Sequence, residues 1–272
     1  MAGQLPNHRD HGRCLDAEQQ SRGDDRTNQC RGGSGDRTIA FVDLSHTIEH
    51  GMTTYPGLPG PIICDYLSRE ASRAHYAPGV EFQIGKIEMV ANTGTYLDAP
   101  FHRYADGKDL AQLPLDSLAD LDAIVVRIGG GAGRAITAKA FKDIEVEGKA
   151  VLVETGWDVH WRTERYLTGH PFLTADAAEN LASRGVKLVG IDSLNIDDTA
   201  DAARPVHSRL LGSGIPIVEH MCNLAGLPGR DFKFFAVPAK VAGFGSWPVR
   251  AFGHVLSAND RLGLSRRRPS IG

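Results

Sequence analysis

The sequence predicts an α/β fold with a mixed β-sheet core and flanking helices. Short runs of β-branched and aromatic residues recur along the chain, several of these runs are apolar throughout, and helical periodicity separates only some of them. A strand that is apolar at every position is buried on both faces, as in a sheet covered by helices. Because strands outnumber convincing helices, we expect a mixed sheet and not a regular doubly wound one.

Eight segments have the composition of strands and are bounded by turn residues. They are residues 38–44, 83–91, 123–128, 150–155, 187–192, 215–219, 232–238 and 249–255. The clearest helix covers residues 174–184, with Thr174 at its N-cap, Asp176 in its first turn and Gly185 just past its end. A shorter helical stretch, 208–214, precedes the strand that ends on Glu219.

Composition predicts one folded domain behind a polar tail. Residues 1–38 are rich in Arg, Asp, Gln, Asn and Gly and have almost no apolar side chains, which is typical of disorder. Residues 39–272 then form a single domain. The net charge of -3 gives no reason to expect nucleic acid or an anionic membrane as a partner, so the expected ligand is a small molecule.

The cysteines and the apolar segments indicate a reducing compartment. Cys14, Cys30, Cys64 and Cys222 form no CxxC pair, which argues against a zinc knuckle and against a disulfide framework. No apolar run is long enough for a membrane-spanning helix, and the amino terminus has no apolar signal segment. We therefore expect a cytoplasmic protein.

Polar side chains are concentrated in the segment 92–102, NTGTYLDAPFH. In an extended strand alternate side chains share a face. The residues expected on one face are Asn92, Gly94, Tyr96 and Asp98. Pro100 would then end the strand and leave Asp98 and His102 at the rim of the sheet. On this segment alone, a functional pair and a turn aspartate beside a surface histidine are equally open.

A second group of candidate residues lies downstream, at His207 and Glu219. A carboxylate at the end of a buried strand is costly unless it is paired or bound to a metal. Together with Asp98, these residues supply one nitrogen and two oxygen donors, a set suited to a divalent ion. His220 follows Glu219 directly, but adjacent strand residues point to opposite faces, so the two should not serve one ion.

Residues 41–255 resemble the cyclase family, which includes bacterial kynurenine formamidase (arylformamidase) and isatin hydrolase. The family's hallmark reads HxGTHxDxPxH where this chain has NTGTYLDAPFH. Further similar blocks occur in the family's order: Asp43–His46, Thr54–Gly57, Gly190–Asp192, and the spacing from His207 to Glu219. The resemblance implies a swivelling β/β/α fold and a homodimer or homotetramer.

The resemblance also implies roles for individual residues. Asp98, His207 and Glu219 match metal ligands, and His102 matches the general acid/base. Tyr55 stands where the family has an aromatic residue near the substrate. Asn92 and Tyr96 depart from the pattern, because the family has histidine ligands at both positions; each could instead contact the metal weakly or stabilise an oxyanion.

These departures favour one metal ion over two. A second ion would lose the two imidazoles that hold it, whereas a single divalent ion is balanced by Asp98 and Glu219. With one nitrogen donor left, either Zn²⁺ or Mn²⁺ suits the site.

The expected activity is hydrolysis of an amide, a formamide such as N-formylkynurenine in tryptophan catabolism, or a lactone, by metal-activated water with His102 as the general acid/base. Two alternatives stay open. The chain could open or close lactone or isatin-type rings on the same scaffold, or it could be a non-catalytic metal-binding or small-molecule-binding protein. A serine hydrolase is disfavoured because the sequence has no GxSxG elbow.

Overall fold

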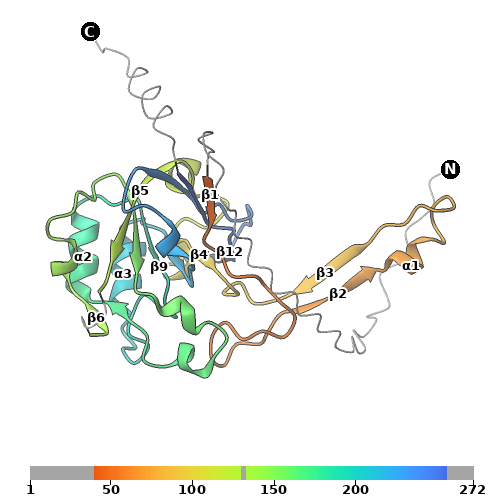
Figure 1. The fold of residues 1–272 in the computed structure, drawn as a ribbon, viewed down its shortest axis with the longest axis horizontal. Helices are drawn as coiled ribbons and strands as arrows, with labels where there is room; N and C mark the ends of the chain where they lie inside the picture. Colours follow the sequence, from red (N-terminus) through yellow and green to blue (C-terminus); the bar gives the residue numbers. More distant parts are fainter. Residues whose placement is uncertain (1–39, 130–132, 256–272) are drawn as a thin grey trace, which may run out of the picture. The chain divides into compact units, whose positions relative to one another are not determined.

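A nine-stranded mixed sheet forms the centre of the protein (Figure 1). The structure, a computed structural model, describes residues 40–129 and 133–255. The strand order is β1-β13-β11-β5-β7-β9-β10-β4-β12. The four strands β5, β7, β9 and β10 run parallel, and the strands on either side pair antiparallel. The prediction of a mixed sheet is confirmed.

The strands of this sheet are β1 (Ala40–Asp43), β4 (Tyr96–Asp98), β5 (Leu121–Arg127), β7 (Ala150–Glu154), β9 (Leu188–Ile191), β10 (Ile217–Glu219), β11 (Phe232–Phe235), β12 (Ser246–Pro248) and β13 (Phe252–Val255). Two small sheets pair β2 (Ile62–Leu67) with β3 (Ile84–Glu88), and β6 (Ala135–Ile136) with β8 (Phe172–Leu173). Each of the eight predicted strand segments overlaps an observed strand.

The described helices are α1 (Arg69–Ser72), α2 (Ala175–Ser183) and α3 (Pro205–Gly212). Short 3₁₀ turns are η1 (Pro100–His102), η2 (Leu115–Ser117), η3 (Ala138–Phe141), η4 (Trp157–His160), η5 (Glu164–Leu167) and η6 (Leu224–Gly226). None of these helices is long and apolar enough to cross a membrane.

Contacts divide the described chain into two compact units. The segment Cys64–Lys86 belongs to one unit and contains α1 with most of the β2–β3 sheet. The other unit holds the nine-stranded sheet and all residues of the candidate site. The predicted tail, 1–38, lies outside the described residues, and the single domain 39–272 stays a prediction.

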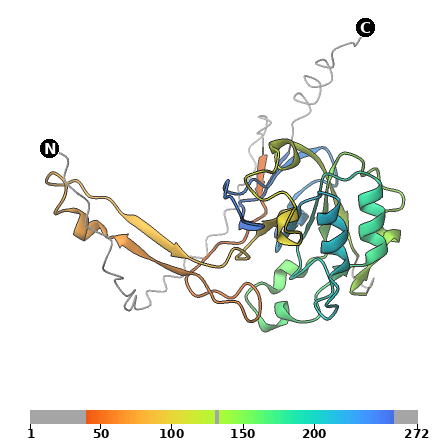
Figure 2. The same ribbon diagram turned by 180° about the vertical axis from the view of Figure 1, so that it is seen from behind.

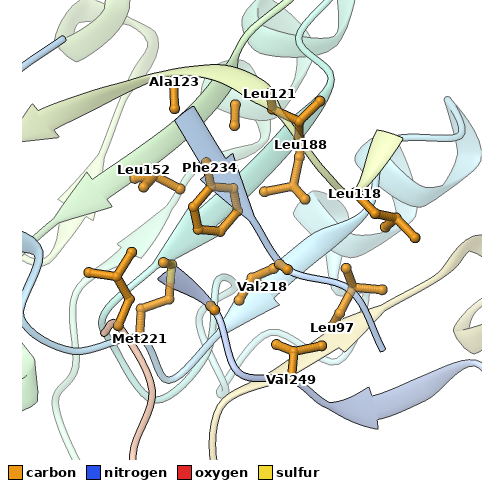
Figure 3. Close-up of a cluster of buried hydrophobic side chains, with 14 of the residues drawn as sticks. Leu97, Leu118, Leu121, Ala123, Leu152, Leu188, Val218, Met221, Phe234 and Val249 are labelled. Atoms are coloured by element: carbon orange, nitrogen blue, oxygen red, sulfur yellow. The ribbon is translucent and has the colours of Figure 1, made fainter. Parts of the chain in front are cut away.

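Each central strand contributes side chains to two hydrophobic clusters, one on either face of the sheet. In β5, Ala123 and Val125 join one cluster, while Ile124 and Val126 join the other. The first cluster is closed by the curved sheet itself, where Phe234 lies among leucines and valines (Figure 3). The second lies under α2 and α3, which pack side by side on one face (Figures 1 and 2). Burial on both faces explains the uninterrupted apolar runs.

Helix α2 matches its prediction in extent but differs in its cap. Gly185 follows it with a positive φ of 71°, as a C-terminal stop requires. Thr174 occupies the N-cap, yet its hydroxyl lies 2.5 Å from Asp176 Oδ1 and 3.1 Å from the Ile136 carbonyl and makes no bond to a helix N–H. The threonine therefore ties the helix to a neighbouring strand.

Two local expectations were wrong in ways that affect the site. Strand β4 begins only at Tyr96, because Gly94 has a positive φ of 66° that interrupts the extended backbone. Asn92 therefore lies in the preceding loop and not on the strand. Helix α3 begins at Pro205, three residues before the predicted stretch, which places His207 in its first turn.

Candidate metal centre and active site

The candidate site lies on one face of the ladder formed by β10 and the antiparallel strands β4 and β12. Glu219 is the last residue of β10 and pairs with Tyr96. Asp98 is the last residue of β4 and pairs with Ser246 of β12. Because alternate strand residues share a face, Tyr96 and Asp98 point to the same side, next to Glu219 and Ser246. This side of the sheet thus collects two carboxylates and two hydroxyls.

His207 reaches the carboxylates from the first turn of α3, and Asp197 sets its orientation. The Asp197 carboxylate accepts hydrogen bonds from the backbone N–H groups of Val206 at 2.7 Å and His207 at 3.0 Å. It also contacts His207 Nδ1 at 2.6 Å. Since a carboxylate accepts, Nδ1 carries a hydrogen, and Nε2 is the nitrogen that faces Asp98 and Glu219. Such carboxylate–histidine pairs typically orient metal-binding imidazoles.

The distances between these groups fit a divalent cation. His207 Nε2 lies 3.6 Å from Asp98 Oδ2 and 3.6 Å from Glu219 Oε1. Two ligands that each bind zinc at its usual bond length in a tetrahedral site lie about 3.4 Å apart. Asp98 Oδ2 is buried and has no hydrogen-bond partner among the described residues. His207 thus lies close to both carboxylates and next to an unsatisfied oxygen, an arrangement whose donors fit a metal ion. The group whose ligand atoms lie close enough together to hold one ion is Asp98, His102 and His207, and Glu219 is not in it.

The carboxylates around His207 also favour a positive charge at this position. Burial by itself would lower the pKa of His207, but Glu219, Asp197 and Asp98 outweigh it and raise this pKa to about 10. Burial raises the pKa of Glu219. The carboxylates thus hold a proton on His207 where a cation would otherwise supply the charge.

His102 follows Asp98 by one turn of η1 and shares a serine with it. Ligand atoms of Asp98, His102 and His207 all lie within 4.8 Å of one another. The Ser246 hydroxyl donates to Asp98 Oδ1 and lies 2.8 Å from His102 Nδ1. Because a hydroxyl has one hydrogen, His102 Nδ1 must be the donor to Ser246. The Nε2 of His102 is then a free acceptor on a side chain that is 37% exposed, as a general base requires.

A glycine lets these two segments approach. A Cβ added to Gly245 would lie 2.4 Å from the backbone N and Cα of His102. The Gly245 carbonyl accepts the N–H of Ala99 at 2.7 Å. Only a residue without a side chain brings Ser246 this close to the turn that carries His102.

The two positions that depart from the family hallmark both carry hydrogen-bond donors. The Tyr96 hydroxyl donates to Glu219 Oε2 at 2.6 Å, and the Asn92 amide donates to the Ser246 hydroxyl at 3.4 Å. Burial, followed by the charges of Glu219 and Asp98, raises the pKa of Tyr96 well above its usual value. The phenol therefore keeps its hydrogen and holds Glu219 in place.

A cavity of about 520 Å³ opens over these residues. Its lining includes His102, His207 and Glu219, as well as the predicted substrate residue Tyr55. Residues 55–58 and 202–204 form much of the rest. A larger cavity of about 690 Å³ lies at the β5–β11 edge, but its described lining holds none of the candidate ligands, so we assign the site to the smaller one.

Sequence reasoning missed three residues that support the site: Asn195, Asp197 and Ser246. Glu219 accepts the Ile196 N–H at 2.6 Å and the Asn195 amide at 3.4 Å. Asp197 lies in an irregular loop ten residues before His207, and Ser246 lies in a three-residue strand. Neither position shows periodicity or spacing that predicts a function. The only available signal was the density of polar residues in SLNIDD, 193–198.

Comparison with known proteins identifies the family. The Cyclase family profile matches residues 42–198 of this chain. The chain belongs to the cyclase family. Kynurenine formamidase from Bacillus cereus is 28% identical over 216 residues, which cover 79% of this chain and 97% of that protein. The enzyme of the same name from Bacillus cytotoxicus is 29% identical over 212 residues, covering 78% and 95%.

Solved structures of this family share the fold. Isatin hydrolase A from Labrenzia aggregata, bound to benzyl benzoate, superposes with a TM-score of 0.69 at 21% identity and covers 80% of this chain and 94% of that chain. A protein from Bacillus stearothermophilus, described as a predicted metal-dependent hydrolase, gives a TM-score of 0.62 at 25% identity, with 80% and 99% covered. The α/β fold implied by the sequence resemblance is thereby confirmed.

Proposed function

We propose that this chain is a metal-dependent hydrolase that cleaves the C–N bond of an aryl formamide or related amide, or the acyl C–O bond of a lactone. The observation that carries the proposal is the placement of His207 Nε2 at 3.6 Å from both Asp98 and Glu219, with an unsatisfied oxygen on Asp98 and the imidazole of His102 beside it. The two curated relatives are both kynurenine formamidases, which supports a formamide as the first substrate to test.

Asp98, His207 and Glu219 would hold one divalent ion, Zn²⁺ or Mn²⁺. When bound, such an ion polarises a carbonyl oxygen and lowers the pKa of water. The two carboxylates balance its charge, and the Asp197 carboxylate fixes the imidazole that donates to it. One ion is proposed because Asn92 and Tyr96 present N–H and O–H donors where a second ion would require lone pairs.

His102 moves the proton. Its Nε2 takes a proton from the attacking water, whose oxygen forms the new bond to the carbonyl carbon. Ser246 accepts from Nδ1 and so keeps the ring in the tautomer that has Nε2 unprotonated. When the C–N bond breaks, the same proton passes from Nε2 to the leaving nitrogen. The products are formate, or another carboxylate, and an amine.

The test combines metal analysis with turnover. Purified protein should contain about one Zn²⁺ or Mn²⁺ per chain by mass spectrometry and should hydrolyse N-formylkynurenine or a member of a panel of aryl formamides, lactones and cyclic amides. Asp98→Asn should lose both the metal and the activity, whereas Asp143→Asn, a change at an exposed aspartate, should lose neither.

Each other outcome is informative. Stoichiometric metal with no turnover of any carbonyl substrate would contradict the hydrolase and favour a binding protein. Activity confined to cyclic substrates would favour the lactone or isatin-type alternative. Full activity of a metal-free Asp98→Asn variant would overturn the metal site itself.

A further inference from the structure

The wall of the candidate cavity carries a guanidinium without a carboxylate partner. Arg204 Nη1 donates to Asn195 Oδ1 at 3.4 Å and to the Asp198 carbonyl at 3.3 Å, and Nη2 donates to the Tyr55 hydroxyl at 3.4 Å. All three acceptors are uncharged, and all three bonds are longer than the 2.7–2.9 Å typical of charge-assisted pairs. Among the described residues, no carboxylate lies within ion-pair distance of this half-buried side chain.

Arg204 also adopts an unusual backbone conformation to reach the cavity. It has φ 47° and ψ 58° at the N-cap of α3, a left-handed geometry that is unfavourable for a long side chain. Hydrogen bonds hold it there, because the Arg204 N–H donates to the Asp201 carbonyl at 3.3 Å and the Arg204 carbonyl accepts from Ser208 at 2.9 Å. Such strained residues cluster at ligand sites.

The charge of the cavity lining is unbalanced around this residue. Two guanidinium groups, Arg103 and Arg204, line the cavity. Glu219 is the only carboxylate among the described lining residues, and it lies at the floor with Asp98 behind it. A divalent ion bound there would neutralise both acids, so the wall would keep a net positive charge. That charge attracts an anion.

The distance from Arg204 to the reacting groups suits a small substrate. Asn195 accepts from Arg204 and donates to Glu219 Oε2 at 3.4 Å, so a single side chain separates the guanidinium from a candidate metal ligand. Tyr55, which contacts Arg204, also lines the cavity and offers a ring face for an aryl group.

We propose that Arg204 binds a carboxylate on the substrate, so that the preferred substrates are aryl amides or formamides that carry a carboxylate group apart from the bond that is cleaved. The inference rests on the proposed function and adds the substrate class. The planar guanidinium presents paired N–H donors that match a carboxylate, and the weak bonds it now makes to neutral oxygens are easily exchanged for it.

The experiment uses matched substrate pairs. Metal-loaded protein is assayed with 3-(2-formamidophenyl)propanoate and 2-formamidobenzoate, each beside its neutral primary carboxamide. We expect at least one carboxylate to be preferred over its carboxamide by roughly 10- to 100-fold in kcat/KM, mostly through KM, because hydrogen bonds to a charged group are worth this factor. Arg204→Gln should abolish the preference, and Arg204→Lys should restore part of it.

Arg209→Gln is the matched control. Arg209 lies on α3 and pairs with Glu179 on the surface, away from the cavity lining, so this change should leave the preference intact. Unfolding midpoints measured for all variants separate a misfolded Arg204→Gln protein from one that has lost a contact.

A second readout does not depend on turnover. Binding of the aminophenyl propanoate product and its carboxamide is measured by calorimetry, and the carboxylate should bind more tightly only when Arg204 is present. If wild type and Arg204→Gln hydrolyse both members of every pair equally, the inference is overturned and the hydrolase stands. If nothing is hydrolysed, the proposed function fails, and the calorimetry alone decides whether Arg204 recognises carboxylates.

Discussion

The floor of the cavity and its wall are stabilised in different ways. The floor, Asp98, His207 and Glu219, is at most 6% exposed, and each of its side chains has a partner at 2.8 Å or closer. On the wall, the side-chain hydrogen bonds of Arg204 to Asn195, Asp198 and Tyr55 are 3.3–3.4 Å long. The short hydrogen bonds of the floor hold its side chains in one arrangement, whereas Arg204 on the wall can exchange its long hydrogen bonds for contacts with a substrate.

This difference separates chemistry from specificity. Reaction geometry must be held closely, so the floor needs supporting residues such as Asp197 and Ser246. Substrate choice depends on a few groups that are satisfied only when the ligand is present. Changes at the floor should therefore alter rate or metal affinity for every substrate.

Among changes that should leave the metal in place, the largest effect should come from His102. His102→Gln keeps a polar side chain but removes the base, so kcat should fall by about 10²- to 10⁴-fold, the usual contribution of a general acid/base. Metal content should be unchanged, because His102 is proposed as the proton carrier and not as a ligand. His75→Gln, at an exposed histidine outside the cavity lining, is the control. Loss of metal from His102→Gln would instead place this residue among the ligands.

Asp197 should have the next largest effect. Asp197→Asn can no longer accept two hydrogens at Oδ2 from His207, and metal affinity should weaken by roughly 10- to 100-fold, as for other groups that orient a ligand. Competition with a chelator measures the affinity. Asp201→Asn, at an exposed aspartate whose carboxylate accepts the Ala203 N–H, is the comparison. Equal affinities in the two variants would show that His207 needs no second carboxylate.

A third prediction tests whether water is excluded from the imidazole of His220, the residue that follows Glu219. Burial lowers the pKa of His220 from 6.5 to about 3, and its Nδ1 contacts the Tyr166 hydroxyl at 2.9 Å. Above pH 6.5 the group is neutral in both states and contributes nothing. As pH falls from 6.5 toward 3, only the unfolded state takes up the proton, so stability is lost.

Between about pH 7 and about pH 5 this single group should reduce the unfolding free energy by about 2 kcal/mol. His220→Asn offers Tyr166 an acceptor that does not titrate, and it should lose that much less stability over the same interval in urea melts. Burial also lowers the pKa of His46, to about 4, so some acid sensitivity should remain in the variant. Identical slopes for variant and wild type would show that His220 is hydrated.

The sequence predicted the elements that depend on composition better than those that depend on distant contacts. Uninterrupted apolar runs located the central strands, because burial on both faces leaves no other pattern. The family resemblance predicted Asp98, His207 and Glu219 as metal ligands. It could not show that Asp197 lies behind His207 or that Ser246 links Asp98 to His102, since these pairings arise from irregular loops and from cross-strand register. Asn92 was misplaced because a single positive φ at Gly94 ends the alternation.

Substitution of Tyr96 should have the smallest effect. It tests one of the two positions at which this chain departs from the family hallmark. Tyr96→Phe removes one hydrogen bond to Glu219, which keeps its bond from the Ile196 N–H at 2.6 Å. Metal affinity should weaken by about 2- to 10-fold, the value of one net hydrogen bond. Tyr66→Phe, at a largely exposed tyrosine, should change nothing. A loss of 100-fold or more would mean that the phenol binds the ion directly, and the floor would then hold four ligands in place of three.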